Sequence, residues 1–242
     1  MGRLSEAYSA MYSLLCGSHP EIRPWHFQYM PTRDLVREVK SLLPELRGRV
    51  LDVGCQEKPY KRWATNATEW VGLDIEGNPF ADIQIKPDSR WPLPDSCLDV
   101  VVSTQMLLFV RDLDLFFSEV NRVLKPGGYF LITAPFIYNE SIDSDFWRFS
   151  IAGGRELVKD DFIVVVEKRL GKFGAVLAQV ILNWMELQSN KWRVGRLLKG
   201  ALLPAWILFS ALVNLNCILL DWIDSTGKFY LGILILAQKK DQ

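Results

Sequence analysis

A glycine and an aspartate that end two apolar segments have the spacing of a nucleotide-binding site. Residues 50–54 read VLDVG and residues 71–74 read VGLD. The first segment predicts a buried strand that runs into a tight turn at Gly54, where the missing Cβ lets a ligand approach the backbone closely. Asp74, at the end of the second segment, can accept hydrogen bonds from two vicinal hydroxyl groups of a ribose. The pattern by itself leaves a plain α/β scaffold open as the alternative.

Apolar segments with strand character alternate with helical segments along the chain. Such alternation predicts a parallel sheet with helices on both faces, and ligands bind such a sheet beyond the carboxyl ends of its strands. Because Gly54, Asp74, Asp88 and Gln105 follow strand ends, we expect these residues to converge on one crevice. The expected strands are 49–53, 70–74, 81–85, 98–103, 129–134 and 162–168, and the clearest helix between them is 113–124.

Sequence motifs over residues 45–170 resemble the class I S-adenosylmethionine (AdoMet) methyltransferases, in particular a bacterial methyltransferase type 11-like subgroup. Residues 51–60 (LDVGCQEKPY) are similar to the subgroup's opening LDVGCGxKPY, and residues 229–239 are similar to its last strand. Several matches in the family's order carry more weight than any one motif. Between the opening segment and the last strand, the further matches are Asp88 with 91–95 (WPLPD), 98–101 (LDVV), 103–107 (STQML), the helix-to-strand turn 122–128 (RVLKPGG), 135–136 (PF) and 145–149 (DFWRF).

The resemblance implies a Rossmann-like fold with a seven-stranded, mostly parallel sheet and AdoMet as the cofactor. It implies that Asp52 supports the cofactor turn and the amino acid end of the donor, that Asp74 binds the ribose and that Asp88 lies beside the adenine amino group. Gln105 is expected to line the methyl channel, and residues 139–149 are expected to face the acceptor. A strand-end carboxylate that caps backbone N–H groups is the alternative role for Asp52.

Methyl transfer from AdoMet requires few catalytic groups from the protein. Methyl transfer from a sulfonium is an in-line displacement, so the site mainly has to align donor and acceptor and exclude water. The histidines of the resembled subgroup are missing at 107–110 (LLFV) and at Glu140. Glu140 or Asp145 is therefore the candidate catalytic base, unless the acceptor needs none or activity has been lost. Asp145 and Arg148 also have the spacing of an ion pair that merely fixes the loop.

One departure from the resembled motif concerns the cofactor turn itself. Gln56 stands where the subgroup has glycine. A side chain at this position makes a close approach of the backbone to the donor less assured.

Composition excludes several functional classes. The chain has 242 residues, which suits one domain with an elaboration, and its net charge is formally zero. Without a basic stripe we expect no nucleic acid partner. Four cysteines without paired spacing favour a reducing, cytoplasmic compartment, and with only two histidines we expect no metal site. The first residues lack a long apolar core, so no secretory signal is expected.

Boundaries in the pattern divide the chain into four parts. Residues 1–44 are expected to form helices that cover the cofactor pocket, and residues 45–170 the AdoMet-binding core. Residues 171–227 form a hydrophobic helical insertion, and residues 228–242 return as the last strand of the core and a tail.

The insertion is the second feature with functional meaning. Residues 200–220 carry no charge and are long enough to span a bilayer. A single span would separate the last strand from its sheet, so we expect a helical hairpin instead. A packed lid or homodimer face, peripheral membrane contact and a true span are the alternatives. The basic residues that precede the uncharged run suit a cytoplasmic flank: Lys191, Arg193, Arg196 and Lys199.

The combined prediction is an AdoMet-dependent methyltransferase that acts on a small-molecule, glycan or lipid-linked acceptor. We expect it in the cytoplasm, and on the inner face of a membrane if the insertion binds lipid. The alternative from another class is a catalytically silent methyltransferase-fold protein that binds a membrane or a partner. A nucleotide-sugar or NAD enzyme is less favoured because the glycine-rich fingerprint of that class is incomplete.

Overall fold

The chain forms two compact units, which we call the helical unit and the sheet unit. The computed structural model describes residues 3–140, 142, 144–191 and 200–241, so the predicted basic residues Arg193, Arg196 and Lys199 lie outside the described residues. The helical unit comprises Met1–Val36 and Leu170–Leu231, and the sheet unit comprises Arg37–Arg169 and Gly232–Gln242.

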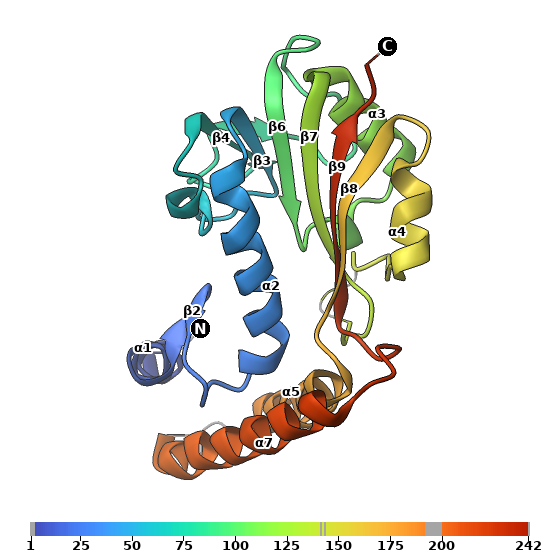
Figure 1. Cartoon of the computed structure of the whole chain (residues 1–242). Coiled ribbons are helices and arrows are strands. Elements are labelled where there is room, and N and C mark those ends of the chain that lie inside the picture. Colours follow the sequence, from blue (N-terminus) through green and yellow to red (C-terminus); the bar gives the residue numbers. More distant parts are fainter. Residues whose placement is uncertain (1–2, 141, 143, 192–199, 242) are drawn as a thin grey trace. The chain divides into compact units, whose positions relative to one another are not determined.

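A seven-stranded sheet is the centre of the sheet unit, with strand order β5-β4-β3-β6-β7-β9-β8 (Figure 1). The strands from β5 to β7 pair in parallel, and β9 runs antiparallel to β7. The predicted seven-stranded, mostly parallel sheet is thus confirmed. The strands are β3 (Gly48–Val53), β4 (Ala67–Ile75), β5 (Ile83–Ile85), β6 (Leu98–Thr104), β7 (Leu124–Pro135), β8 (Phe162–Leu170) and β9 (Gly232–Lys239).

The order of the strands reverses at β3, and this reversal positions the ligand-binding edge. From β3 the chain adds β4 and β5 on one side and then crosses to add β6 on the other. Leu51 accordingly pairs with Val71 of β4 and with Val101 of β6. Because these strands are parallel, their carboxyl ends lie at the same edge, and a crevice is expected where the order reverses.

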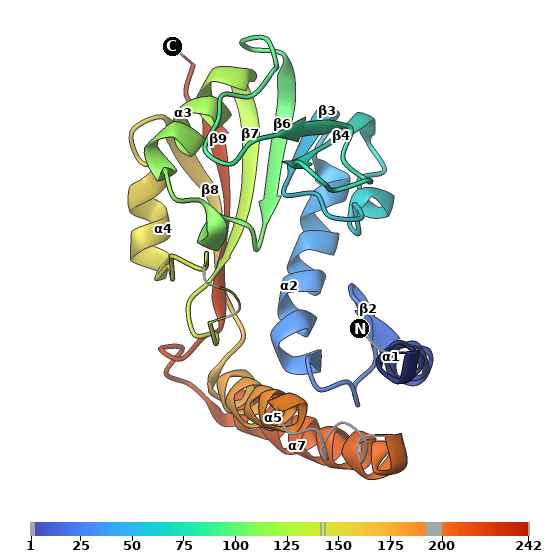
Figure 2. The ribbon, with the colours of Figure 1, turned by 180° about the vertical axis from the view of Figure 1, so that it is seen from behind.

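Helix α3 (Leu113–Val123) covers the strands beside that edge. The Asp112 side chain caps its start by accepting a hydrogen bond of 2.9 Å from the Leu115 N–H. Phe116 and Phe117 pack on Phe130 of β7, with ring centroids 6.3 and 5.9 Å apart. Figure 2 shows α3 in front of β7 and β9. The apolar face of α3 therefore closes the core over the central strands.

Residues 125–128 differ from the predicted helix-to-strand turn. They belong to β7, which begins directly after α3. Leu98 of β6 pairs with Leu124 and Val100 pairs with Tyr129, so residues 125–128 oppose Asp99 alone and form a bulge. Gly127 has a φ of +71°, a conformation that glycine adopts without a steric penalty. Gly127 thus allows the backbone conformation of the bulge within β7.

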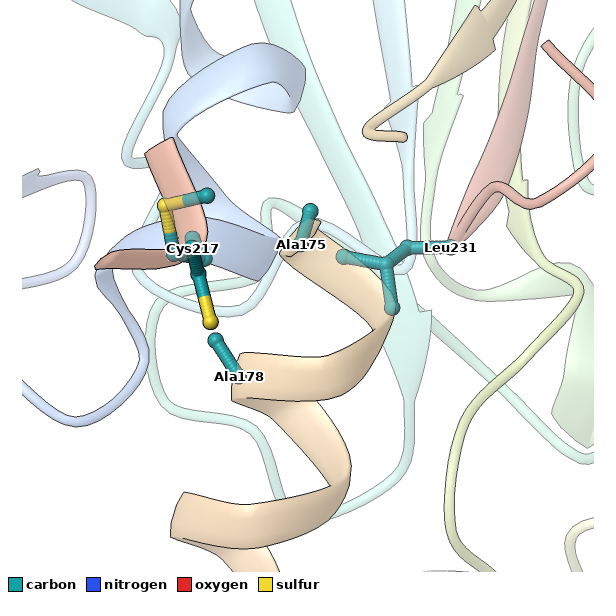
Figure 3. Packing of buried hydrophobic residues seen from close by; sticks show 5 residues of the cluster. Ala175, Ala178, Cys217 and Leu231 are labelled. Carbon is teal, nitrogen blue, oxygen red and sulfur yellow. The ribbon is translucent and has the colours of Figure 1, made fainter. Parts of the chain in front are cut away.

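The helical unit contains the apolar insertion, folded as two packed helices. A Cβ on Gly174, near the start of α5, would lie 1.9 Å from the Cys217 carbonyl oxygen near the end of α7, so the helices are antiparallel and nearly touch. Figure 3 shows Ala178 pointing toward Cys217 at this contact, and Ala175 belongs to the same buried cluster. The predicted apolar insertion before the last strand is confirmed. The described helices of this unit are α1 (Arg3–Cys16), α5 (Phe173–Lys191) and α7 (Leu203–Ile223), with the hairpin β1 (Gly17–Ser18) and β2 (Glu21–Ile22), and α2 (Tyr29–Leu42) runs on into the sheet unit.

The two ends of the insertion meet. The Leu231 N–H donates a hydrogen bond of 2.8 Å to the Leu170 carbonyl oxygen. The chain therefore leaves the end of β8 and returns to the start of β9 at nearly the same place.

Candidate functional site

The turn after β3 is built for close approach to the backbone. Gly54 has a φ of +74°, and its N–H donates a hydrogen bond of 2.8 Å to the Leu73 carbonyl oxygen of β4. A Cβ at this position would lie 2.3 Å from Cγ of Met106. Glycine is required here for its φ and for the space that Met106 takes.

Asp74 at the end of β4 ties this turn to the next loop. Its Oδ2 accepts hydrogen bonds from the Gln56 N–H at 3.0 Å and from Nδ2 of Asn78 at 2.7 Å. Its Oδ1 accepts one from the Ile75 N–H at 2.8 Å. A carboxylate has about four acceptor positions, so Asp74 keeps capacity for a hydroxyl group of a ligand.

Gln56 adopts a backbone conformation that glycine takes without a steric penalty. Its φ is +45°, in the left-handed region that non-glycine residues rarely adopt. Its side chain is exposed and is not among the residues that line the adjacent cavity. The substitution therefore introduces strain at this position without filling the cradle at Gly54.

Asp52, on β3 two residues before Gly54, is a buried carboxylate. Only 2% of its surface is exposed, and its Oδ2 has no hydrogen-bond partner among the described residues. Burial raises the pKa of Asp52 from 3.8 to about 7. A cationic group such as an ammonium would satisfy this oxygen and favour the charged carboxylate, which is the chemistry of the donor's amino acid end.

A cavity of about 550 Å³ opens at the carboxyl edge of the sheet. Gly54, Asp74 and Asp88 line it, so the structure brings these three predicted residues together. The predicted residues Asp52 and Gln105 do not line this cavity. Every residue that lines the cavity belongs to the sheet unit.

Asp88 and Gln105 both adopt left-handed backbone conformations beside the site, with φ values of +50° and +52°. Oδ1 of Asp88 accepts a hydrogen bond of 3.2 Å from the Asp112 N–H. The Gln105 N–H donates to the Thr133 carbonyl oxygen at 2.9 Å, and its Nε2 donates to Oγ1 of Thr133 at 3.2 Å. Such strain in non-glycine residues occurs preferentially at ligand-binding sites.

The two predicted base candidates lie in different surroundings. Glu140 is exposed, whereas the Asp145 carboxylate is buried and forms an ion pair with both terminal nitrogens of Arg148. Arg148 also donates hydrogen bonds to the carbonyl oxygens of Tyr138 and Asn139, at 3.4 and 3.0 Å. The pair therefore fixes the loop, which is the structural alternative for Asp145. Neither Glu140 nor Asp145 lines the cavity.

Other residues of the same loop do reach the cavity, and the sequence analysis did not single them out. Ile142, Ser144 and Phe146 line it, together with Met106 and Arg111. The guanidinium of Arg111 lies over the Phe146 ring, 5.1 Å from its centroid. The sequence signal for these residues was their position next to matched motifs, because Met106 follows Gln105 and Phe146 follows Asp145.

Comparison with protein families identifies the central part of the sheet unit. Residues 51–132 match a family model described as "Methyltransferase domain". This segment runs from β3 to β7 and includes Asp52, Gly54, Asp74, Asp88 and Gln105.

Two curated relatives come from Mycolicibacterium smegmatis. A "Probable S-adenosylmethionine-dependent methyltransferase" is 44% identical over 96 residues, which cover 36% of this chain and 37% of the relative. A "Fatty-acid O-methyltransferase" is 31% identical over 99 residues, which cover 35% of this chain and 36% of the relative. The chain thus spans little more than a third of the length of these relatives.

Similarity of fold extends further than similarity of sequence. An S-adenosylmethionine dependent methyltransferase from Mesorhizobium loti superposes with a TM-score of 0.52 at 18% identity, and the match covers 87% of this chain and all of that chain.

Proposed function

Because residues 51–132 belong to the class I AdoMet-dependent methyltransferases, we propose that this protein transfers the methyl group of AdoMet to a lipid-type carboxylic acid. The observation that supports AdoMet as the methyl donor is the grouping of Gly54 and Asp74 at one cavity, with the unsatisfied Asp52 carboxylate behind the turn. The identity of the methyl acceptor is inferred from the residues that line the same cavity.

The residues at the carboxyl edge fit the parts of AdoMet. We place the amino acid end of the donor beside Gly54, which lines the cavity, and Asp52 behind the turn supplies a negative charge for its ammonium group. Asp74 accepts a hydrogen bond from a ribose hydroxyl, and Asp88 takes the adenine role that the family resemblance assigns. Gln105 does not line the cavity, so its methyl-channel role stays a prediction from the resemblance. When bound, AdoMet supplies a methyl group that its sulfonium already activates.

The cavity walls near residues 139–149, which are expected to face the acceptor, favour an apolar substrate with one anionic group. Ile142, Phe146 and Phe109 present apolar surface to the cavity. Arg111 is the one basic residue among the described residues that line it. We assign to Arg111 the recognition of a carboxylate, which a guanidinium binds with paired hydrogen bonds. The relative named a fatty-acid O-methyltransferase supports the same class of acceptor.

A carboxylate acceptor also accounts for the missing base. A carboxylic acid has a pKa of about 4 to 5 and is already ionised near neutral pH. A carboxylate oxygen would attack the methyl carbon of AdoMet as the carbon–sulfur bond breaks. The electron pair of that bond would stay on sulfur, so no proton has to move. The loss of the subgroup's histidines and the engagement of Asp145 by Arg148 then cost the reaction nothing.

The experiment that tests the proposal titrates the protein with AdoMet by calorimetry and then measures transfer of labelled methyl to fatty acids. We expect Asp74→Asn to weaken AdoMet binding by roughly tenfold or more, because hydrogen bonds to a charged group contribute about 1.5–3 kcal/mol each. Glu76→Gln removes a nearby exposed charge in the same loop and should leave binding unchanged.

The outcomes separate the competing functions. Binding without transfer to fatty acids, but with transfer to a neutral or glycan acceptor, would overturn the carboxylate assignment. Binding without any transfer would favour the catalytically silent protein. Absence of AdoMet binding would overturn the enzymatic proposal as a whole.

A further inference from the structure

One face of helix α7 is exposed and, apart from Asn216, apolar. Its exposed residues recur with helical spacing, so they form a single stripe, which we call the outer stripe. Leu215 is 57% exposed and Trp222 is 85% exposed. The outer stripe consists of Leu208, Leu212, Leu215, Leu219 and Trp222.

The opposite face of α7 is the polar one, and it is buried. Ser210, Asn214 and Asp221 lie on it, with Cys217 between them. Nδ2 of Asn214 donates hydrogen bonds to the carbonyl oxygens of Pro24 and His26, at 2.8 and 2.9 Å. Asp221 pairs with Arg33 at 2.9 Å and accepts a hydrogen bond from the Ala175 N–H at 3.0 Å. The polar groups of α7 are therefore directed into the helical unit.

This arrangement is the reverse of an ordinary surface helix. A helix on the surface of a protein in water turns its apolar face inward and its polar face outward. In lipid the preference inverts, because polar groups have to be satisfied inside the protein. Asn216, the one polar residue of α7 that is exposed, donates a hydrogen bond of 2.7 Å to the Leu212 carbonyl oxygen of its own helix. That bond satisfies one N–H group of the side chain within its own helix.

Helix α5 repeats the inversion beside α7. Val180, Trp184 and Leu187 are exposed at helical spacing, whereas Gln179 and Asn183 are buried. Figure 1 shows the two helices lying along each other, in orange and red. Both helices of the insertion thus carry exposed apolar residues.

An apolar groove continues this surface toward α1. It has a volume of about 560 Å³ and runs between Met11 and Leu15 of α1 and Leu203, Ile207 and Leu208 at the start of α7. Leu208 belongs to both the groove and the outer stripe. A groove of this kind is suited to a hydrocarbon chain rather than to a flat protein surface.

The connection between α5 and α7 indicates the charge of the occupant. Its sequence, residues 191–199 (KWRVGRLLK), carries four basic residues and no acidic ones. Basic residues next to an apolar helix are attracted to anionic lipid headgroups.

The topology decides between lying on a bilayer and crossing it. Among the described residues α7 is the one helix long and apolar enough to cross a membrane, by length and composition alone. The hydrogen bond between Leu231 and Leu170, however, holds both ends of the insertion together. A single crossing by α7 would pull these ends to opposite sides.

We propose that the outer stripe, the exposed face of α5 and the adjoining groove seat the protein on the surface of an anionic lipid bilayer. The helices then lie in the plane of the membrane with their apolar faces in the outer acyl region. This inference goes beyond the proposed function, because AdoMet binding does not depend on it.

Vesicle flotation of the full chain tests the proposal, with vesicles of phosphatidylcholine and phosphatidylglycerol. We expect the protein to float with the vesicles, and Leu212→Glu with Leu215→Glu to reduce the bound fraction by roughly tenfold or more, since a charge in the acyl region is costly. Ile163→Glu on β8 is the matched control, because Ile163 is 59% exposed and lies outside the insertion. It should float as the wild type does.

Two results would overturn the proposal. One is a wild-type protein that stays at the bottom of the gradient. The other is a wild-type dimer in light scattering that Leu215→Glu converts to a monomer, which would assign the stripe to a second copy of the chain. AdoMet titration of the same variants, expected to be unchanged, keeps a failure here distinct from a failure of the methyltransferase proposal.

Discussion

At the residue scale, the buried carboxylate of Asp52 links stability to pH. Its folded pKa of about 7 lies above the ordinary value of 3.8. The group therefore contributes stability that is fully present below pH 3.8 and is lost as the pH rises through about 7. Within this window the unfolding free energy should fall by about 1.4 kcal/mol per pH unit on account of this residue.

Asp52→Asn, which carries no charge at any pH in this range, should abolish that fall. Urea denaturation of both proteins without AdoMet, at several pH values between these limits, measures it. Asp114→Asn, a change of an exposed carboxylate on α3, should keep the wild-type slope. Parallel profiles for Asp52→Asn and the wild type would contradict the assignment.

Arg111 carries the prediction about the acceptor. Arg111→Ala should raise the KM for a fatty acid by roughly tenfold or more, because a hydrogen-bonded ion pair contributes about 1.5–3 kcal/mol to binding. AdoMet affinity should stay the same, and Arg90→Ala, an exposed cation outside the cavity lining, should change neither quantity. Steady-state kinetics of the three proteins measures this, and equal KM values would refute the role of Arg111.

Gln56 carries a conformational prediction. Glycine at this position should relieve the strain at φ +45° and stabilise the protein by about 1 kcal/mol, with AdoMet affinity retained. The N–H group that bonds Asp74 is kept in the variant. Gln56→Ala keeps the strain and serves as the control. A thermal melt in which Gln56→Gly unfolds at a lower temperature than Gln56→Ala would contradict this reasoning.

At the scale of elements, the contact between α5 and α7 tests how closely two helices can pack. Gly174→Ala should destabilise the protein by about 1–3 kcal/mol, because its Cβ would overlap the Cys217 carbonyl oxygen. Gly153→Ala in α4 (Ile151–Val158) should instead stabilise by about 0.5–1 kcal/mol, since a Cβ there meets only Oγ of Ser150 at 3.4 Å. Chemical denaturation of both variants measures the sign, and equal effects would show that helix propensity alone decides.

At the scale of the whole molecule, the residues of the proposed donor site all belong to the sheet unit. A chain of residues 37–169 joined to 232–242 by a short Gly/Ser linker should therefore bind AdoMet within a few-fold of the full protein. The hydrogen bond between Leu170 and Leu231 shows that the linker has little distance to cover. Calorimetric titration of a folded product measures this. A loss of tenfold or more would mean that the N-terminal helices contribute to the pocket, as the sequence analysis expected.

The elements were largely predictable because each depends on neighbours in the sequence. The expected strand 98–103 became Leu98–Thr104, and the expected helix 113–124 became Leu113–Val123. The turn at Gly54 and the acid at Asp74 could be recognised for the same reason, since a tight turn and a strand end are local features. The sequence by itself thus determined the order of the elements and the residues at the sheet edge.

Tertiary structure alone decided what depends on residues far apart in the chain. Residues 125–128 form a bulge because only Asp99 of β6 lies opposite them. Asp145 forms an ion pair with Arg148, which also donates hydrogen bonds to two carbonyl oxygens of the loop. The apolar run at 200–220 gave the length of α7, but Pro24, His26 and Arg33 decided which of its faces points outward. Long-range contacts of this kind leave no periodic signal in the sequence, which is why the outer stripe emerged only once the chain was folded.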